Sequence, residues 1–149
     1  MDKPLYRRML LPTDGAEASQ RAIFAGVAFA RELGAEVIGL TAVPSFRVLS
    51  ADPEMVGDTA DEYAEASRER ARHLLADVEN AAREAGVACR VEHVMSDEPW
   101  ESIVETARRL DCDLIVMASH GRRGVKSLLL GSETQKVLVH SNIPVLVHR

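Results

Sequence analysis

The sequence predicts an α/β protein in which an open, five-stranded parallel sheet carries helices on both faces, the Rossmann-like architecture. Three observations lead to this prediction. The chain of 149 residues suits one domain with a full core, so residues 1–149 are treated as a single unit. Short apolar runs alternate with segments of helical periodicity. The connections between them are mostly short, and repeated strand–helix units joined in this way form a parallel sheet wrapped by helices.

The first part of the chain contains two strands that flank a helix. An apolar run predicts a strand over residues 8–13, which has to end near Pro12 because proline lacks a backbone N–H. Small and apolar residues then recur every three or four positions, which predicts a helix over residues 16–33 with one buried face. Gly34 is the expected stop of this helix, and residues 36–43 form the second predicted strand.

The middle of the chain continues the same alternation. Residues 45–57 lack a clear period and predict a surface loop. A charged segment over residues 59–85 predicts a long helix, and a third strand is expected over 87–94. A helix over 99–110 and a nearly all-apolar strand over 113–117 come next. Such a strand is typical of a sheet with both faces covered.

The last part of the chain adds one helix and one strand. A loop rich in glycine and basic residues, over 118–130, precedes a short helix that begins at Ser132. Gln135 follows Ser132 at the spacing of a capping box, in which side chains bond the free N–H groups of a helix start. Residues 143–148 form the final predicted strand.

Charge is unevenly distributed along the chain. The formal net charge is −5, yet residues 114–149 carry five basic residues against one acidic residue. The acidic excess lies in residues 51–113, which carry seventeen acidic residues against seven basic ones, and the charged residues of the predicted helix over 59–85 are expected to form a solvated face. A net negative chain is not expected to bind nucleic acid in general. The basic stretch at the end leaves room for a local anion site.

Composition also bears on the cellular compartment. The apolar run over residues 114–118 is far shorter than the roughly 20 residues of a membrane helix. The first residues show no export signal. Cys89 and Cys112 do not form a CxxC motif and are expected to be reduced thiols, buried or half-buried. These features predict a cytoplasmic protein without membrane contact.

The loop after the fourth predicted strand is the most informative segment. Ligands of open parallel sheets bind at the carboxyl ends of the strands, and this loop leads from such an end into a helix. Glycines let backbone N–H groups approach a phosphate, and a helix start favours an anion. The loop and the residue that follows it contain three glycines and three basic residues: Gly121, Gly124, Gly131, Arg122, Arg123 and Lys126. It therefore predicts a phosphate site, with a solvated flexible loop as the alternative, although its spacing is neither Walker A nor GxGxxG.

Four segments together resemble the universal stress protein family. Nucleotide-binding members of that family carry a glycine, two residues, a second glycine, nine residues and then Gly-Ser or Gly-Thr. Gly121, nine intervening residues and then Gly131 and Ser132 match this pattern, whereas Ala118 stands in place of the first glycine. Three further segments agree with the family, over residues 10–14, 40–43 and 142–147.

The resemblance implies a fold and a function. The family fold is the adenine nucleotide α-hydrolase-like parallel sheet, and its members are usually homodimers joined through the last strand, here Ile143 to His148. By resemblance, the chain is expected to bind ATP, ADP or AMP, with Mg²⁺ held through the phosphates. It is further expected to act as a dimeric stress-response sensor or regulator with at most slow hydrolysis, on a protein partner that the sequence does not name.

The resemblance also implies binding residues, carried over position by position. Asp14 would contact the ribose or the adenine edge, and Ala42 and Val43 would frame adenine. The motif glycines and the serine after them would hold phosphates, while Arg122 and Arg123 are added on charge alone. The candidate nucleotide-binding residues are Pro12, Thr13, Asp14, Ala42, Val43, Ala118, His120, Gly121, Arg122, Arg123, Gly124, Gly131, Ser132, Glu133 and Thr134.

Two departures from the family pattern leave a second interpretation open. Ala118 replaces a motif glycine. Asp97 stands where the family often has glycine, and its carboxylate would repel a nearby triphosphate unless Mg²⁺ intervened. The structural interpretation of Asp97 is a helix N-cap or a first-turn acid. The alternative function is a nucleotide-free, dimeric protein-interaction module of the same fold.

Catalytic and metal sites have weaker support in the sequence. A triad of Ser119, His120 and Asp14 is imaginable, but Ser119 does not lie in a GxSxG elbow. The histidines lack HExxH spacing, so no protein-bound metal is predicted. An ATP-using transferase of the adenine-α-hydrolase kind would need an SGGxDS-type loop, which the chain lacks after its first strand. Trp100 is expected to be a packing residue at a helix start.

Overall fold

A five-stranded parallel sheet forms the centre of the computed structural model, which describes residues 3–45, 59–121 and 130–149. The strands are β1 (Arg8–Pro12), β2 (Glu36–Val43), β3 (Cys89–Met95), β4 (Leu114–Ala118) and β5 (Val145–His148). They lie in the order β3-β2-β1-β4-β5, and every neighbouring pair is parallel. The predicted fold class is confirmed.

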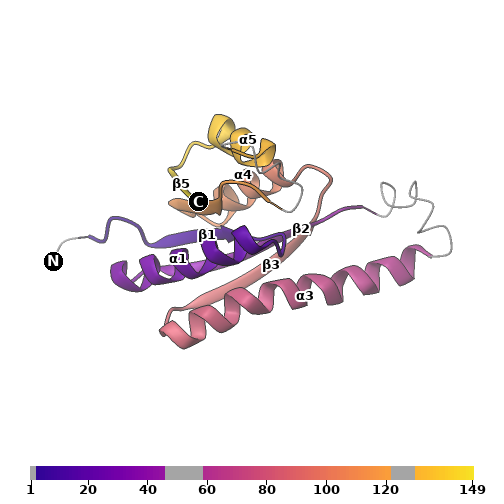
Figure 1. The fold of residues 1–149 in the computed structure, drawn as a ribbon, viewed down its shortest axis with the longest axis horizontal. Coiled ribbons are helices and arrows are strands. Elements are labelled where there is room, and N and C mark those ends of the chain that lie inside the picture. The colour runs from indigo at the N-terminus through magenta and orange to yellow at the C-terminus, as the bar shows by residue number, and fades with distance from the viewer. Residues whose placement is uncertain (1–2, 46–58, 122–129) are drawn as a thin grey trace.

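Helices cover both faces of this sheet (Figure 1). The helices α1 (Glu17–Leu33) and α3 (Ala60–Ala85) pack on one face, and α4 (Pro99–Arg109) and α5 (Ser132–His140) pack on the other. With 26 residues, α3 is the longest helix in the described part of the chain, and it runs past the end of the sheet (Figure 1).

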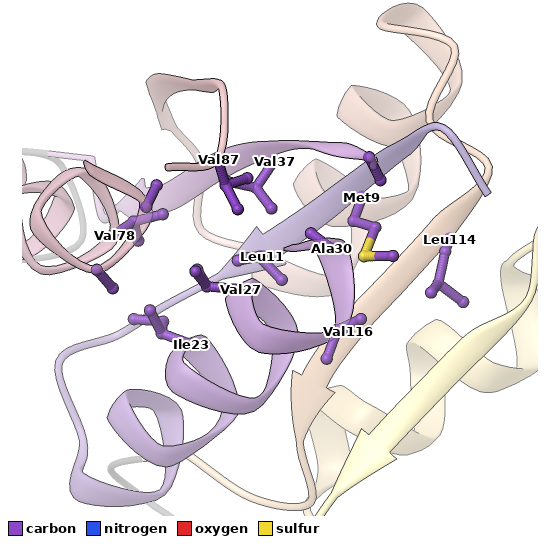
Figure 2. Packing of buried hydrophobic residues seen from close by; sticks show 13 residues of the cluster. Met9, Leu11, Ile23, Val27, Ala30, Val37, Val78, Val87, Leu114 and Val116 are labelled. Atoms are coloured by element: carbon purple, nitrogen blue, oxygen red, sulfur yellow. The ribbon is translucent and has the colours of Figure 1, made fainter. Parts of the chain in front are cut away.

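Apolar side chains fill the space between the sheet and each pair of helices. The cluster under α1 and α3 includes Met9, Leu11, Val27, Ala30, Val37, Val78 and Val116 (Figure 2). The cluster under α4 and α5 includes Leu10, Ile38, Ile103, Ile115, Met117 and Val137. Leu114 and Val116 of β4 belong to the first cluster and Ile115 and Met117 to the second, and all five residues of the strand are buried. This double burial explains the continuous apolar run of β4 in the sequence.

Most helix ends lie where the sequence predicts them. Gly34 and Gly86 end α1 and α3 in the left-handed conformation, with φ of 67° and 71°, and their N–H groups bond the last carbonyls of each helix. Thr59 caps α3 in a full capping box with Glu62. Trp100 packs at the start of α4, with its ring centroid 4.3 Å from that of His140, so its predicted packing role is confirmed.

Two strands begin two residues later than the sequence predicts. The third strand begins at Cys89 rather than residue 87, because the Val87 N–H completes the end of α3 by bonding the Ala82 carbonyl at 2.8 Å. The last strand begins at Val145 rather than residue 143, because the Ile143 N–H bonds the Ser141 hydroxyl in a preceding turn. The expected loops fall mainly outside the described residues, which omit 46–58 and 122–129.

The two edges of the sheet differ in chemistry. β3 lies at one edge and carries Arg90, Glu92 and His93, and Glu92 forms an ion pair with Arg109 of α4. β5 lies at the other edge with the sequence Val-Leu-Val-His, and Leu146 is 37% exposed. Charged side chains discourage pairing with another sheet, whereas an apolar edge invites it.

Both thiols are free. Cys112 is buried and Cys89 is half-buried, as the sequence predicts. Burial raises the pKa of each thiol to about 11, so the protonated form dominates at neutral pH. Of the helices that the structure describes, none combines the length and the apolar character needed to cross a membrane.

The close packing of α3 on β2 generates a stability prediction. A methyl group at Gly39 would lie 3.0–3.1 Å from three side-chain atoms of Val78. We expect Gly39→Ala to lower the free energy of unfolding by about 1–3 kcal/mol through overpacking. Adding Val78→Ala should make room for the methyl, so the double variant should lose less than the sum of the two single losses in urea denaturation.

The matched control pairs Gly39→Ala with Val137→Ala. Val137 is fully buried on the opposite face of the sheet, so these two losses should add. Simple additivity of Gly39→Ala and Val78→Ala as well would contradict the packing explanation.

Candidate functional site

The sheet changes direction at β1, and this position defines the candidate site. The chain runs from β1 outward to β2 and β3, and then returns to β4 and β5 on the other side of β1. The helix after β1 covers one face of the sheet, while the helix after β4 covers the other. Connections that diverge in this way leave a crevice at the carboxyl ends of the two strands, where ligands of such sheets bind.

Asp14 lies at this point, directly after β1. Its Oδ1 accepts hydrogen bonds from the backbone N–H of Ala16 at 3.0 Å and from the hydroxyl of Ser19 at 2.9 Å. Its Oδ2 lies so close to Gly121 that a side chain at that glycine would overlap the oxygen. The end of β1 and the segment after β4 therefore meet through Asp14 and Gly121.

Thr13, a predicted site residue, is held within the sheet. Its N–H bonds the Leu40 carbonyl at 2.8 Å, and its carbonyl accepts the hydroxyl of Thr41 at 2.8 Å. Its own hydroxyl accepts the N–H of Gly15 at 3.2 Å, and the residue is 6% exposed. Thr13 thus shapes the turn that presents Asp14, and Pro12 before it is half-buried at the end of β1.

The segment after β4 is fixed by hydrogen bonds to β5 and α5. Ser119 donates its N–H to the His148 carbonyl at 3.0 Å and accepts the Gly131 N–H at 2.6 Å. The Ser119 hydroxyl is 2.9 Å from Nδ1 of its neighbour His120, and Ser119 is only 3% exposed. A nucleophile in the imagined triad would have to face a substrate, but this hydroxyl is enclosed by the protein.

The start of α5 offers backbone donors next to this segment. Gly131 is the N-cap, and no side chain caps the helix. Because the first N–H groups of a helix have no partner inside it, those of Ser132, Glu133 and Thr134 form an anion-binding arrangement. A methyl group at Gly131 would lie 3.0 Å from Cα of His120, so the close approach of these two segments requires a glycine.

The predicted capping box at Ser132 is wrong. Ser132 is the first residue of the helix rather than its cap, and the Gln135 side chain donates to the Leu130 carbonyl at 2.9 Å. The reason is the glycine before it, whose extended backbone takes the N-cap position and leaves the N–H groups of the first turn without a side-chain partner.

Two further candidate residues bond the protein through their side chains. The Thr134 hydroxyl donates to the Ala118 carbonyl at 2.9 Å and is buried. The Glu133 carboxylate accepts the Trp100 N–H at 2.8 Å and lies 3.7 Å from Lys136. Both side chains thus fasten α5, to β4 and to α4 respectively. What these residues present to the crevice is their backbone N–H groups.

Asp97 departs from its expected role. Both of its oxygens accept hydrogen bonds from Ser45, one from the N–H and one from the hydroxyl, each at 2.8 Å. Glu98 is the N-cap of α4 instead, so the N-cap or first-turn prediction for Asp97 is wrong. Pro99 has no backbone N–H, and the backbone N–H of Trp100 bonds the Glu133 carboxylate. Neither of these two first-turn residues therefore donates to Asp97.

This Asp97–Ser45 contact fastens the end of β3 to the end of β2. Ser96 adds a bond from its N–H to the Val43 carbonyl at 2.8 Å. Ala42 and Val43, expected to frame adenine, are half-buried at the end of β2, next to β1 in the sheet. The carboxylate of Asp97 is therefore occupied in holding the strand end that these residues form.

The described candidate residues lie together at the carboxyl ends of β2, β1 and β4 and at the start of α5. Ala118 is only 6% exposed at the end of β4, so its methyl group is enclosed by the protein. Arg122, Arg123 and Gly124 lie outside the described residues. Within residues 3–45, 59–121 and 130–149, no three or more histidine, cysteine or acidic side chains cluster closely enough to hold a metal ion.

The sequence did not predict the roles of Ser19, which bonds the Asp14 carboxylate, and Ser45, which bonds the Asp97 carboxylate. Ser19 carried a signal, because it is a polar residue on the predicted buried face of the helix over 16–33. Ser45 carried none, since it lies 52 positions from Asp97 and only the fold brings them together.

Comparisons with known proteins agree with this geometry. A model of the universal stress protein family matches residues 5–149. Universal stress protein MJ0531 of Methanocaldococcus jannaschii is 32% identical, over 96% of this chain and 82% of the relative. The solved structure of MJ0577, from the same organism, is 30% identical with a TM-score of 0.81, over 96% of this chain and 95% of that chain.

A further solved structure is described as a universal stress protein in complex with cAMP. It is 26% identical to this chain with a TM-score of 0.67, and the match covers 97% of each chain. The family model, the curated relative and the solved structures all span nearly the full sequence. The chain belongs to the universal stress protein family.

Proposed function

We propose that this protein binds ATP, or another adenine nucleotide, at the carboxyl edge of its sheet and acts as a dimeric stress-response sensor or regulator. The observation that carries the proposal is the close approach at Gly121 and Gly131, beside a helix start without a side-chain cap. A side chain at either glycine would intrude on a neighbouring segment, and the first N–H groups of α5, which have no partner within the helix, suit phosphate oxygens. The relative solved with cAMP shows that an adenine nucleotide suits this fold.

The strand order gives the nucleotide an orientation. Adenine would lie at the end of β2 beside Ala42 and Val43, and the phosphates would lie at the start of α5. The ribose then falls between them, at the end of β1, where Asp14 stands. A carboxylate accepts hydrogen bonds and repels phosphate, so Asp14 suits a ribose hydroxyl. Mg²⁺ would be held mainly by the phosphate oxygens.

Titration calorimetry with ATP and Mg²⁺ tests the binding proposal directly. We expect the wild-type chain to bind and Gly131→Val to weaken binding by about ten-fold or more, because each lost phosphate hydrogen bond to a charged group is worth about 1.5–3 kcal/mol. The backbone at Gly131 has φ of −69°, which valine adopts, so the cost arises from the contact with His120.

Gly34→Ala is the matched control for that experiment. Gly34 precedes β2, at the opposite end of the strand from the site, and its φ of 67° makes the substitution costly to stability. This variant should melt earlier yet bind ATP as the wild type does. If the wild type bound no nucleotide at millimolar concentration, the nucleotide-free interaction module would replace the proposal.

We further propose that any ATP hydrolysis is too slow to be the main role. The titratable groups nearest the crevice are engaged, since His120 bonds the Ser119 hydroxyl and Asp14 bonds Ala16 and Ser19. We infer from these bonds that both residues serve to hold the site rather than to activate water. We expect a turnover in a phosphate-release assay well below the ~1 s⁻¹ that marks the low end of typical enzymes. Turnover of tens per second would contradict a purely regulatory role.

We propose that two copies associate through β5. This strand pairs only with β4 among the described strands, and Leu138, Val139 and Leu146 are exposed near this edge. The carbonyls of Pro144 and His148 point to β4. Because backbone groups alternate in direction along a strand, those of Val145 and Val147 point to the open edge. An isologous antiparallel pair would satisfy those groups.

Val147→Pro tests the pairing, because it removes one open-edge N–H and leaves the bonds to β4 intact. We expect sedimentation at micromolar concentration to show a dimer for the wild type and a shift toward monomer for this variant. Circular dichroism should show both to be folded. A wild-type monomer, or an unchanged dimer in the variant, would contradict association through this edge.

We propose the cytoplasm as the site of action, where a regulator of this kind meets both its nucleotide and its protein partner. The support is chemical. Cys89 and Cys112 remain free thiols, on opposite faces of the sheet, which suits a reducing compartment.

A further inference from the structure

Ser19 is a buried polar residue on the core-facing side of α1. It is 5% exposed, and its neighbours on that side of the helix, Ala22 and Ile23, pack in the core. A hydroxyl in such surroundings is costly unless it is hydrogen-bonded. The Ser19 hydroxyl meets this need by donating to Oδ1 of Asp14 at 2.9 Å, five residues earlier in the chain.

This bond fixes the direction of the Asp14 carboxylate. Oδ1 is held by two donors, the Ser19 hydroxyl and the Ala16 N–H. The second oxygen, Oδ2, lies next to Gly121 in the segment after β4. Removing the Ser19 hydroxyl would take away the donor that ties Oδ1 to α1, so the orientation of the carboxylate would be less restricted.

We propose that Ser19 is a positioning residue that orients Asp14 to accept a hydrogen bond from a ribose hydroxyl. This inference rests on the proposed nucleotide function and adds the residue that makes its ribose contact directional. The ligand class is a nucleotide with a free ribose diol. A hydrogen bond to a carboxylate contributes most when the acceptor is already oriented, because no side-chain entropy is then lost on binding.

The test compares ATP with 2′,3′-dideoxy-ATP, which lacks both ribose hydroxyls, on the full chain with Mg²⁺. We expect the wild type to bind ATP about ten-fold more tightly than the dideoxy nucleotide, the ratio typical of a hydrogen bond to a charged group. In Ser19→Ala this ratio should fall to about two or less, mainly through weaker ATP binding. Affinity for the dideoxy nucleotide should stay nearly constant, a readout that general destabilisation would not produce.

Two variants keep the test specific. Ser67→Ala removes another buried helical hydroxyl, on α3, and should leave the ratio at its wild-type value. Ser19→Thr retains the hydroxyl and should restore the preference for ATP. In an Asp14→Ala background, Ser19→Ala should cause no further change in the ratio, because Ser19 acts through Asp14.

The outcomes separate the inference from the proposed function. If the wild type bound neither nucleotide, the function would be wrong and the inference would fall with it. If the wild type bound both equally, nucleotide binding would stand but Asp14 would not read the ribose, and the inference would be overturned. An unchanged ratio in Ser19→Ala, or equal losses for both nucleotides, would also overturn it and leave the function intact.

Discussion

The central position of β1 is the constraint on which the rest of the structure depends. It bonds β2 on one side and β4 on the other, and its residues Met9, Leu10 and Leu11 are at most 1% exposed. The strand ends at Pro12, and the N–H of Thr13 makes one more bond to the Leu40 carbonyl of β2 before the chain turns toward Asp14. The crevice, the orientation of Asp14 and its meeting with Gly121 all follow from that fixed end.

The sequence predicted the elements well because their causes are local. Helical periodicity, the left-handed stops at Gly34 and Gly86, and the unbroken apolar run of β4 each depend on neighbouring residues and on burial. The two errors have different causes, a distant partner at Asp97 and an adjacent glycine that takes the N-cap position at Ser132. Asp97 bonds Ser45 because the fold brings β3 beside β2, and Ser132 lost its expected capping role to the glycine before it. The spacing of residues along the chain does not show which partner Asp97 will bond or which residue will cap α5.

The candidate site shows the same division. The sequence places the strand ends and the glycine spacing, because parallel strands bring their carboxyl ends to one edge. It does not distinguish side chains that face the crevice from those that build it. Glu133 and Thr134 adjoin the motif yet fasten α5 to its neighbours, whereas Ser19, outside the motif, contacts Asp14 directly. Three-dimensional contacts, not motif membership, assign these roles.

The unlike edges of the sheet limit how large an assembly can grow. An open-ended chain of paired sheets requires that both edge strands of every subunit pair with a neighbouring subunit. Here the β3 edge carries charged side chains, and only the β5 edge is apolar. If two copies pair through β5, as proposed, neither has a second apolar edge left, so the assembly stops at the dimer. Charged side chains on an edge strand oppose pairing with another sheet, so Arg90 and Glu92 would oppose growth beyond that dimer.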